Sequence, residues 1–243
     1  MFLHGIGGNR GNWTDQLVAF AKHFMAVAWD ARGWGGSEDY EGPLQFADFT
    51  ADLLRVLDAF GAPSAHFVGL SMGGFILQDF YHRCPQRVRS LVLADTSIGP
   101  ASEHGEQWIE EFLALRKQPL LAGRTPREIA PGVVKTLAGR SATPAIVRRL
   151  EDSIAALRKD SYLKAMDAVM RYRAPLDYAS VKVPTLVVVG EEDELTPPAA
   201  ARHLADRIPG ARLEVIPRAG HLSNIEQPET FNRVVLDFLL AHR

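Results

Sequence analysis

Short and almost uninterrupted apolar runs recur along the chain, each bounded by glycine, proline or charged residues. They read HFMAVAWD, AHFVGLS, SLVLADT, TLVVVGEED and RLEVIPRAG, near residues 26, 67, 92, 187 and 214. Strands that are buried on both faces have this appearance, whereas half-buried strands alternate apolar and polar residues. The runs therefore predict strands inside a sheet that is covered on both sides.

Segments with helical spacing lie between several of these runs. In residues 46–60 and again in residues 231–239, apolar side chains recur every three or four positions and would form one stripe on a helix. Alternation of buried strands with amphipathic helices is typical of a parallel sheet that carries helices on both faces. We predict an α/β fold with a doubly wound, mostly parallel sheet.

The pattern changes between residues 98 and 173, where no strand is predicted. Four helix-like segments follow one another there, separated by Pro119, Pro126, Pro131 and Pro144, and the strand pattern resumes at VKVPTLVVVG. We therefore expect a core made of residues 1–97 and 174–243, with a helical cap of residues 98–173 inserted into it. An insert after the carboxyl end of a strand lies where α/β sheets bind ligands, so it is expected to cover a site as a lid.

Composition and charge exclude several classes of protein. With 243 residues, 47% of them hydrophobic and 23% charged, the chain resembles an ordinary single-core globular protein. The formal net charge of -2, without long runs of one sign, gives no electrostatic surface for nucleic acid, so a small-molecule partner is expected. The sequence leaves the oligomeric state open between monomer and dimer.

Cysteine content and hydropathy bear on the cellular compartment. Cys84 is the only cysteine, which rules out an internal disulfide and a cysteine-based zinc site and favours a reducing cytoplasm. No apolar run has the length of a membrane span, and the first residues do not read as a signal peptide. We therefore expect a cytoplasmic protein without a membrane partner.

The segment VGLSMGG places Ser71 at the end of an apolar run, with Gly69 two residues before it and Gly73 two residues after it. A sharp turn from strand to helix would expose the serine hydroxyl, and glycines at the two flanking positions would avoid the crowding that a Cβ would cause. The segment GGFILQDFYHRC that follows has the apolar spacing of a buried helix. Ser71 is therefore a candidate nucleophile.

A serine hydroxyl needs a base to take its proton and a carboxylate to orient that base. His221 follows the run RLEVIPRAG, and Asp193 follows TLVVVG within a cluster of carboxylates. Ser71, Asp193 and His221 each come directly after a predicted strand, so the three side chains can meet at one edge of the sheet. Asp95, at the end of SLVLADT, is an alternative for the orienting acid.

The glycine-rich opening, MFLHGIGGNRG, fits two kinds of site. It could be a dinucleotide-binding turn with Asp30 as the acid that binds a ribose, but Arg10 stands where that motif needs a third glycine. The alternative is an oxyanion hole, in which the backbone N–H groups of Ile6 and Met72 meet the negative oxygen formed during acyl transfer. The second interpretation also gives the candidate serine, histidine and aspartate a role.

Five segments together resemble the α/β-hydrolase superfamily over essentially the whole chain. They are HGIGG, DARGWGGS at residues 30–37, GLSMGG, GEEDELTPP and AGHLSNIEQPETF. The resemblance implies an α/β-hydrolase fold, a nucleophilic Ser71, a helical cap and no cofactor or metal, with Asp30, Arg32 and Gly33 shaping the scaffold. A serine at position 71 in place of an acid is unlike a haloalkane dehalogenase.

Members of this superfamily usually carry further strands before the HG motif, whereas only Met1–Leu3 precede it here. The resemblance therefore leads us to expect that N-terminal strands are missing from this sequence and that an upstream segment exists. An unpaired strand at the edge of a sheet would otherwise favour aggregation.

Within the superfamily, the sequence is most similar to small carboxylesterases and 3-oxoadipate enol-lactonases. We expect a serine hydrolase that cleaves carboxylic esters or lactones through an acyl-enzyme. Alternatives on the same residues are a cofactor-free haloperoxidase or perhydrolase and a carbon–carbon hydrolase, and a further alternative is a binding protein without catalysis. A lactonase of that kind must bind a free carboxylate, for which the candidates are Arg116, Arg124, Arg140 and Arg173.

Overall fold

A parallel five-stranded sheet forms the centre of the protein in a computed structural model that describes all residues, 1–243. Its strands lie side by side in chain order: β1 (Phe2–Leu3), β2 (Ala65–Leu70), β3 (Val88–Ala94), β4 (Thr185–Gly190) and β5 (Arg212–Ile216). All four neighbouring pairs are parallel. The predicted α/β class and the parallel sheet are confirmed.

The first of the five predicted strands is wrong as a full strand. Residues 23–30 contribute only an isolated bridge between Ala28 and Phe2, in which the Phe2 N–H donates to the Val27 carbonyl at 2.8 Å. The ladder stays short because β1 offers only two residues for pairing on that side. The other four apolar runs overlap β2, β3, β4 and β5, of which β3 begins two residues before its run.

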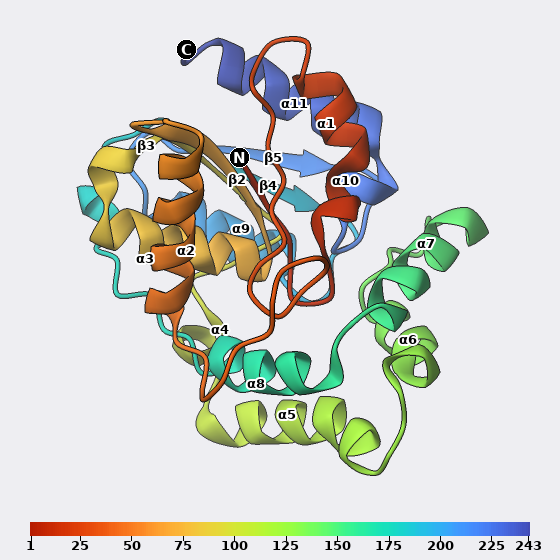
Figure 1. The fold of residues 1–243 in the computed structure, drawn as a ribbon. Coiled ribbons are helices and arrows are strands. Elements are labelled where there is room, and N and C mark those ends of the chain that lie inside the picture. The colour runs from red at the N-terminus through yellow and green to blue at the C-terminus, as the bar shows by residue number, and fades with distance from the viewer.

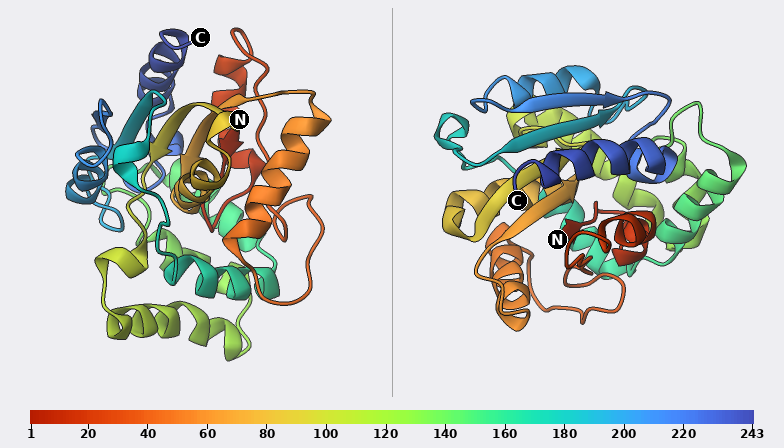
Figure 2. Two further views of the ribbon diagram at one scale, coloured as in Figure 1. Left: turned by 90° about the vertical axis from the view of Figure 1, so that its left-hand side faces the viewer. Right: turned by 90° about the horizontal axis from the view of Figure 1, so that it is seen from above.

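Helices cover both faces of the sheet, and alternate residues of each strand point to opposite faces. In β4, Val187 and Val189 belong to the larger apolar cluster, whereas Leu186 and Val188 belong to a second one. The larger cluster includes residues of α2 (Phe46–Ala59), α3 (Met72–Arg83) and α9 (Pro198–Ala205). The second includes residues of α1 (Thr14–Phe20) and α11 (Pro228–Leu240), which lie side by side in Figures 1 and 2.

Five helices follow one another between β3 and β4 and lie beyond one end of the sheet (Figure 1). They are α4 (Pro100–Glu103), α5 (Glu106–Leu121), α6 (Pro126–Val134), α7 (Pro144–Ala155) and α8 (Lys159–Met170). They enclose an apolar cluster of their own, to which Ile225 is added from outside the insert. We call these helices the cap; its boundaries at residues 98 and 173 stay a prediction about domain organisation.

Two of the four prolines that were predicted to separate the helices of the cap do so, and two do not. Pro126 and Pro144 each begin a helix, after the capping residues Thr125 and Thr143. Pro119 and Pro131, however, lie inside α5 and α6 and separate nothing. A proline inside a helix removes one hydrogen bond, and the burial of neighbouring apolar side chains in the cap cluster outweighs that loss.

The remaining elements are short. They are α10 (Ser223–Glu226) and the 3-10 helices at Arg10–Trp13, Pro85–Arg87 and Tyr178–Ser180. No helix of the protein combines the length and the apolar character that a membrane crossing requires.

Candidate active site

Ser71 occupies a strained turn between β2 and α3. Its φ of 54° lies in the left-handed region, which residues other than glycine seldom adopt. A Cβ at Gly69 would lie 2.4 Å from the carbonyl oxygen of Gly73, and a Cβ at Gly73 would lie 2.4 Å from the carbonyl oxygen of Leu3. The two flanking glycines therefore allow β1, β2 and α3 to approach closely enough to form the turn.

Asp193 and His221 contact each other after β4 and β5. The Nδ1 atom of His221 lies 2.9 Å from Oδ2 of Asp193, and both residues are only 3% exposed. The other carboxylate oxygen accepts hydrogen bonds from the backbone N–H groups of Leu195 and Thr196, and the Thr196 hydroxyl donates to Oδ2 at 2.8 Å. The carboxylate is thereby held toward the imidazole, with Nδ1 as the donor.

Burial and charge act against each other on this pair. Burial alone would raise the pKa of Asp193, but the charge of His221 and the hydrogen bond to it leave that pKa below its usual value. Burial alone would lower the pKa of His221, but the charge and hydrogen bond of Asp193 leave that pKa above 6.5. An ionised Asp193 beside His221 is the electrostatic arrangement that stabilises an imidazolium ion.

Asp95, the alternative acid, is directed elsewhere. Its Oδ1 accepts the Gly190 N–H at 2.9 Å, and its Oδ2 accepts the Ser223 hydroxyl at 2.6 Å. No hydrogen bond joins Asp95 to His221, although its charge acts on that residue. Burial, followed by the nearby charge of Asp193, raises the pKa of Asp95 to about 8.

Ser71 lies at the meeting point of two cavities. One, of about 60 Å³, is lined by Ser71 and His221, and the other, of about 90 Å³, extends from Ser71 under the cap. Ile6 and Leu195 line both. No hydrogen bond joins the hydroxyl of Ser71 to His221. In enzymes, such a hydrogen bond often becomes short and well aligned only when substrate is bound.

The two backbone groups expected to form an oxyanion hole are free of partners. Neither the Ile6 N–H nor the Met72 N–H donates to any acceptor within the protein. The Ile6 carbonyl is held by the indole Nε1–H of Trp34, which donates to it at 3.0 Å. The loop that carries Ile6 is thus fixed through its carbonyl while its N–H stays unpaired beside the cavity.

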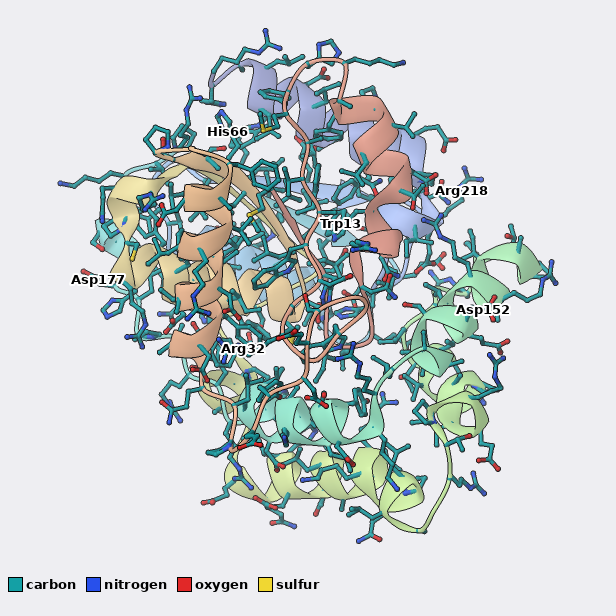
Figure 3. The ribbon with its side chains drawn as sticks, in the orientation of Figure 1. Trp13, Arg32, His66, Asp152, Asp177 and Arg218 are labelled. Atoms are coloured by element: carbon teal, nitrogen blue, oxygen red, sulfur yellow. The ribbon has the colours of Figure 1, made fainter.

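Asp30, the acid of the alternative dinucleotide site, and Arg32, expected to shape the scaffold, both make polar contacts within the protein. The Asp30 carboxylate accepts the backbone N–H groups of Arg10 and Gly36 at 2.7 and 2.8 Å. Arg32, labelled in Figure 3, donates from Nε and Nη2 to the two oxygens of Asp52.

No group of three His, Cys, Asp or Glu side chains is arranged to hold a metal ion.

His4 is a residue of the site to which the sequence analysis assigned no role. Its Nε2 accepts the Ala31 N–H at 3.1 Å, so the proton resides on Nδ1, which donates to the Gly5 carbonyl at 2.8 Å. Burial lowers the pKa of His4 to about 4, which keeps the ring neutral. His4 thereby orients the backbone just before Ile6; its position next to Gly5 was the available signal.

Glu226 is a second residue that the sequence analysis missed. It is buried, and its Oε2 accepts the N–H groups of Gly139 in the cap and Gly220 beside His221, each at 3.0 Å. The His221 N–H donates to the Leu137 carbonyl of the cap at 2.8 Å. The loop of His221 is therefore joined to the cap, and the polar residues of HLSNIE were the signal for this role.

Two buried polar atoms along the smaller cavity have no partner, namely Nε1 of Trp13 and Oδ1 of Asn224. Trp13, labelled in Figure 3, directly precedes α1.

A larger apolar cavity, of about 370 Å³, is lined by Met1, Phe24 and Phe60 and contains none of the candidate catalytic residues.

The chain is similar to known proteins over most of its length. The sequence profile described as "Alpha/beta hydrolase family" matches residues 1–234. The chain is 28% identical to 3-oxoadipate enol-lactonase 2 of Acinetobacter baylyi, covering 97% of this chain and 86% of that protein.

Two further similarities involve hydrolases. The chain is 30% identical to a 2-hydroxy-6-oxononadienedioate/2-hydroxy-6-oxononatrienedioate hydrolase of Burkholderia vietnamiensis, covering 98% of this chain and 86% of that protein. A crystal structure of a hydrolase from Pseudomonas aeruginosa superimposes with a TM-score of 0.84 at 34% identity, covering 98% of this chain and 88% of the other.

Proposed function

The chain belongs to the alpha/beta hydrolase family, and from this premise we propose that it hydrolyses small carboxylic esters or lactones with Ser71 as the nucleophile. The observation that supports the proposal most is the hydrogen bond between Asp193 and His221, at the cavity that also contains Ser71. A buried, carboxylate-oriented histidine beside a strained serine that lines a cavity is the arrangement that activates a hydroxyl.

In the proposed reaction, Ser71 Oγ attacks the carbonyl carbon while His221 Nε2 accepts the hydroxyl proton. The electron pair of the carbonyl moves to its oxygen, which accepts hydrogen bonds from the Ile6 and Met72 N–H groups. When the intermediate collapses, the bond to the leaving alcohol breaks and His221 returns the proton to it. Water then attacks the acyl-enzyme by the same route and regenerates Ser71.

The protonation states support this sequence. Asp193, with its lowered pKa, is ionised at neutral pH and keeps the His221 proton on Nδ1, so that Nε2 accepts. The imidazolium formed after proton transfer is stabilised by the same carboxylate, which is the origin of the raised pKa of His221.

The experiment combines covalent labelling with kinetics. A fluorophosphonate probe is expected to label the wild-type protein at Ser71, and Ser71→Ala is expected to lose about 10⁵-fold or more of its turnover of a 4-nitrophenyl ester. Thermal melting of the variant serves as the control for folding. Alanine carries a Cβ as serine does, so the substitution leaves the strain of the backbone at this position unchanged. Labelling at another residue, or wild-type turnover by Ser71→Ala, would contradict the proposed mechanism.

A substrate panel tests the reaction class. The proposal expects hydrolysis of 4-nitrophenyl esters and simple lactones, with 3-oxoadipate enol-lactone as one member of the panel. A protein that cleaves only carbon–carbon bonds of vinylogous diketones, or that binds these compounds without turnover, would contradict it. A preference of about a hundredfold between members corresponds to about 3 kcal/mol of transition-state discrimination and would identify the substrate class.

A further inference from the structure

One arginine lines the cavity that extends from Ser71 under the cap. Of the four arginines considered as carboxylate ligands, only Arg116 lines this cavity. Arg140 pairs with Glu192 at 3.4 Å and is 81% exposed, and Arg124 and Arg173 are also exposed. The cavity therefore distinguishes Arg116 from the other three.

Arg116 is partly withdrawn from water without a carboxylate to balance its charge. The residue is half-buried, and no acidic side chain lies within ion-pair distance of it. Its one hydrogen bond runs from Nη2 to the Thr136 hydroxyl at 2.5 Å. Burial lowers the pKa of Arg116, and only Tyr162 opposes this effect. A guanidinium group has five N–H donors, so most of them are left without a protein acceptor.

An aromatic row leads along α5 to this guanidinium. His104 stacks on Trp108 with ring centroids 3.7 Å apart, Trp108 stacks on Phe112 at 5.2 Å, and the Arg116 guanidinium lies 5.1 Å from the Phe112 ring. Trp108, Phe112 and Arg116 follow one another at intervals of four within α5, which places them on one face of the helix, and His104 lies just before the helix begins. All four line the cavity.

The other wall comes from α8, which lies beside α5 in Figures 1 and 2. Met166, Val169 and Met170 supply apolar side chains to the cavity from this helix. The acidic group that lines the same cavity, Glu103, is exposed and makes no ion pair with Arg116. A mostly apolar cavity with one charged group that lacks a counterion is typical of a site that orients a ligand through that group.

We propose that Arg116 binds a free carboxylate of the substrate, so that the preferred substrate is an ester or lactone that carries a second, anionic end. This inference rests on the proposed hydrolase function, because it takes Ser71 as the group that attacks the ester. A carboxylate can accept two parallel hydrogen bonds from a guanidinium group, which is the strongest polar pairing available to Arg116. The aromatic row and α8 would contact the carbon chain between the two ends.

The experiment compares a charged substrate with its neutral analogue. Mono-4-nitrophenyl adipate and mono-4-nitrophenyl suberate carry a free carboxylate, and the corresponding methyl 4-nitrophenyl diesters have similar length without the charge. The wild-type enzyme is expected to show a kcat/KM about tenfold or more higher for at least one monoester than for its diester. Because the carboxylate is bound equally before and during the reaction, the difference is expected mainly in KM.

Arg116→Gln is expected to lower kcat/KM for the monoesters about tenfold more than for the diesters, which abolishes this preference. Arg116→Lys keeps the positive charge but loses the two parallel N–H donors of the guanidinium group. It should therefore show part of the wild-type preference, in contrast to Arg116→Gln. Arg124→Gln, which removes an exposed arginine of the same cap, is the matched control and should behave as wild type. Thermal melting of each variant reports whether the cap remains folded.

The outcomes separate the two proposals. Equal wild-type rates for monoester and diester, or a preference that persists in Arg116→Gln, would overturn the role of Arg116 while leaving the hydrolase function intact. An equal loss on both substrates in Arg116→Gln would also overturn it, since that result indicates a structural role. No hydrolysis of any ester, together with no fluorophosphonate labelling, would overturn the hydrolase function and this inference with it.

Discussion

Asp95 and Asp193 follow neighbouring parallel strands and are both buried, yet the structure gives them different surroundings. Asp193 contacts His221 and three donors of its own loop, whereas Asp95 joins the end of β4 to the start of α10 through Gly190 and Ser223. The pKa of Asp193 lies below its usual value and that of Asp95 is raised to about 8. The two acids therefore share burial and a position at a strand end, and their hydrogen-bond partners are what distinguish them.

The largest expected effect separates the two acids by activity. Asp193→Asn should lower kcat/KM for a 4-nitrophenyl ester by about 10⁴-fold, because an amide no longer holds the required tautomer or stabilises the imidazolium. Asp95→Asn should lower it by less than about tenfold, because an amide oxygen can still accept the Gly190 N–H. Similar losses in the two variants would show that the comparison does not distinguish their roles.

The pH dependence of stability gives a second difference. Because the folded-state pKa of Asp95 is about 8 and its usual value is 3.8, the folded protein keeps this proton over a pH range where the unfolded chain releases it. Stability from this group therefore falls as pH rises from about 4 to about 8. An asparagine side chain cannot ionise, so Asp95→Asn should be more stable than wild type at pH 9 and similar to it near pH 4.

Chemical denaturation at several pH values measures this difference. A gap between Asp95→Asn and wild type that does not change with pH would mean that Asp95 is ionised throughout, because the Gly190 N–H, the Ser223 N–H and the Ser223 hydroxyl that donate to it outweigh its burial. A variant that is less stable than wild type at pH 9 would lead to the same conclusion.

The smallest expected effect concerns the hydroxyl that binds Asp95. Ser223→Ala removes a buried donor at 2.6 Å from the carboxylate and should lower the free energy of unfolding by about 1–2 kcal/mol. Ser102→Ala is the control, because the Ser102 hydroxyl makes no hydrogen bond within the protein. Urea denaturation compares the two, and equal losses would indicate that the Ser223 hydroxyl makes no specific contribution.

Much of the sheet could be predicted from the sequence, because a strand buried on both faces needs apolar residues at every position. Residues 65–70, 88–94 and 185–190 are mostly apolar, buried strands. Residues 212–216 are also a strand, but they form the edge of the sheet and only Ile216 is buried, so burial on both faces was wrong for this run. Residues 23–30 are an apolar run as well, but a strand also needs a partner of matching length, and β1 supplies two residues. Pro119 and Pro131 were wrong as helix boundaries because local preference was outweighed by packing in the cap.

The sequence by itself determined which residue types end each strand of the sheet. Ser71, Asp193 and His221 could be named because glycines and carboxylates at strand ends have a recognisable local pattern. Local pattern depends on neighbours along the chain, and this is the part of the physics that a sequence displays directly.

Only the tertiary structure decided which of these groups touch. The partner of His221, the carboxylate that joins Gly139 to Gly220, and the arginine that lines the cavity at Ser71 all depend on contacts between segments far apart in the chain. Asp95 and Asp193 look alike in sequence because each follows an apolar run. They differ in the folded protein because hydrogen bonds act over about 3 Å, and that distance is set by how the strands, loops and cap pack together.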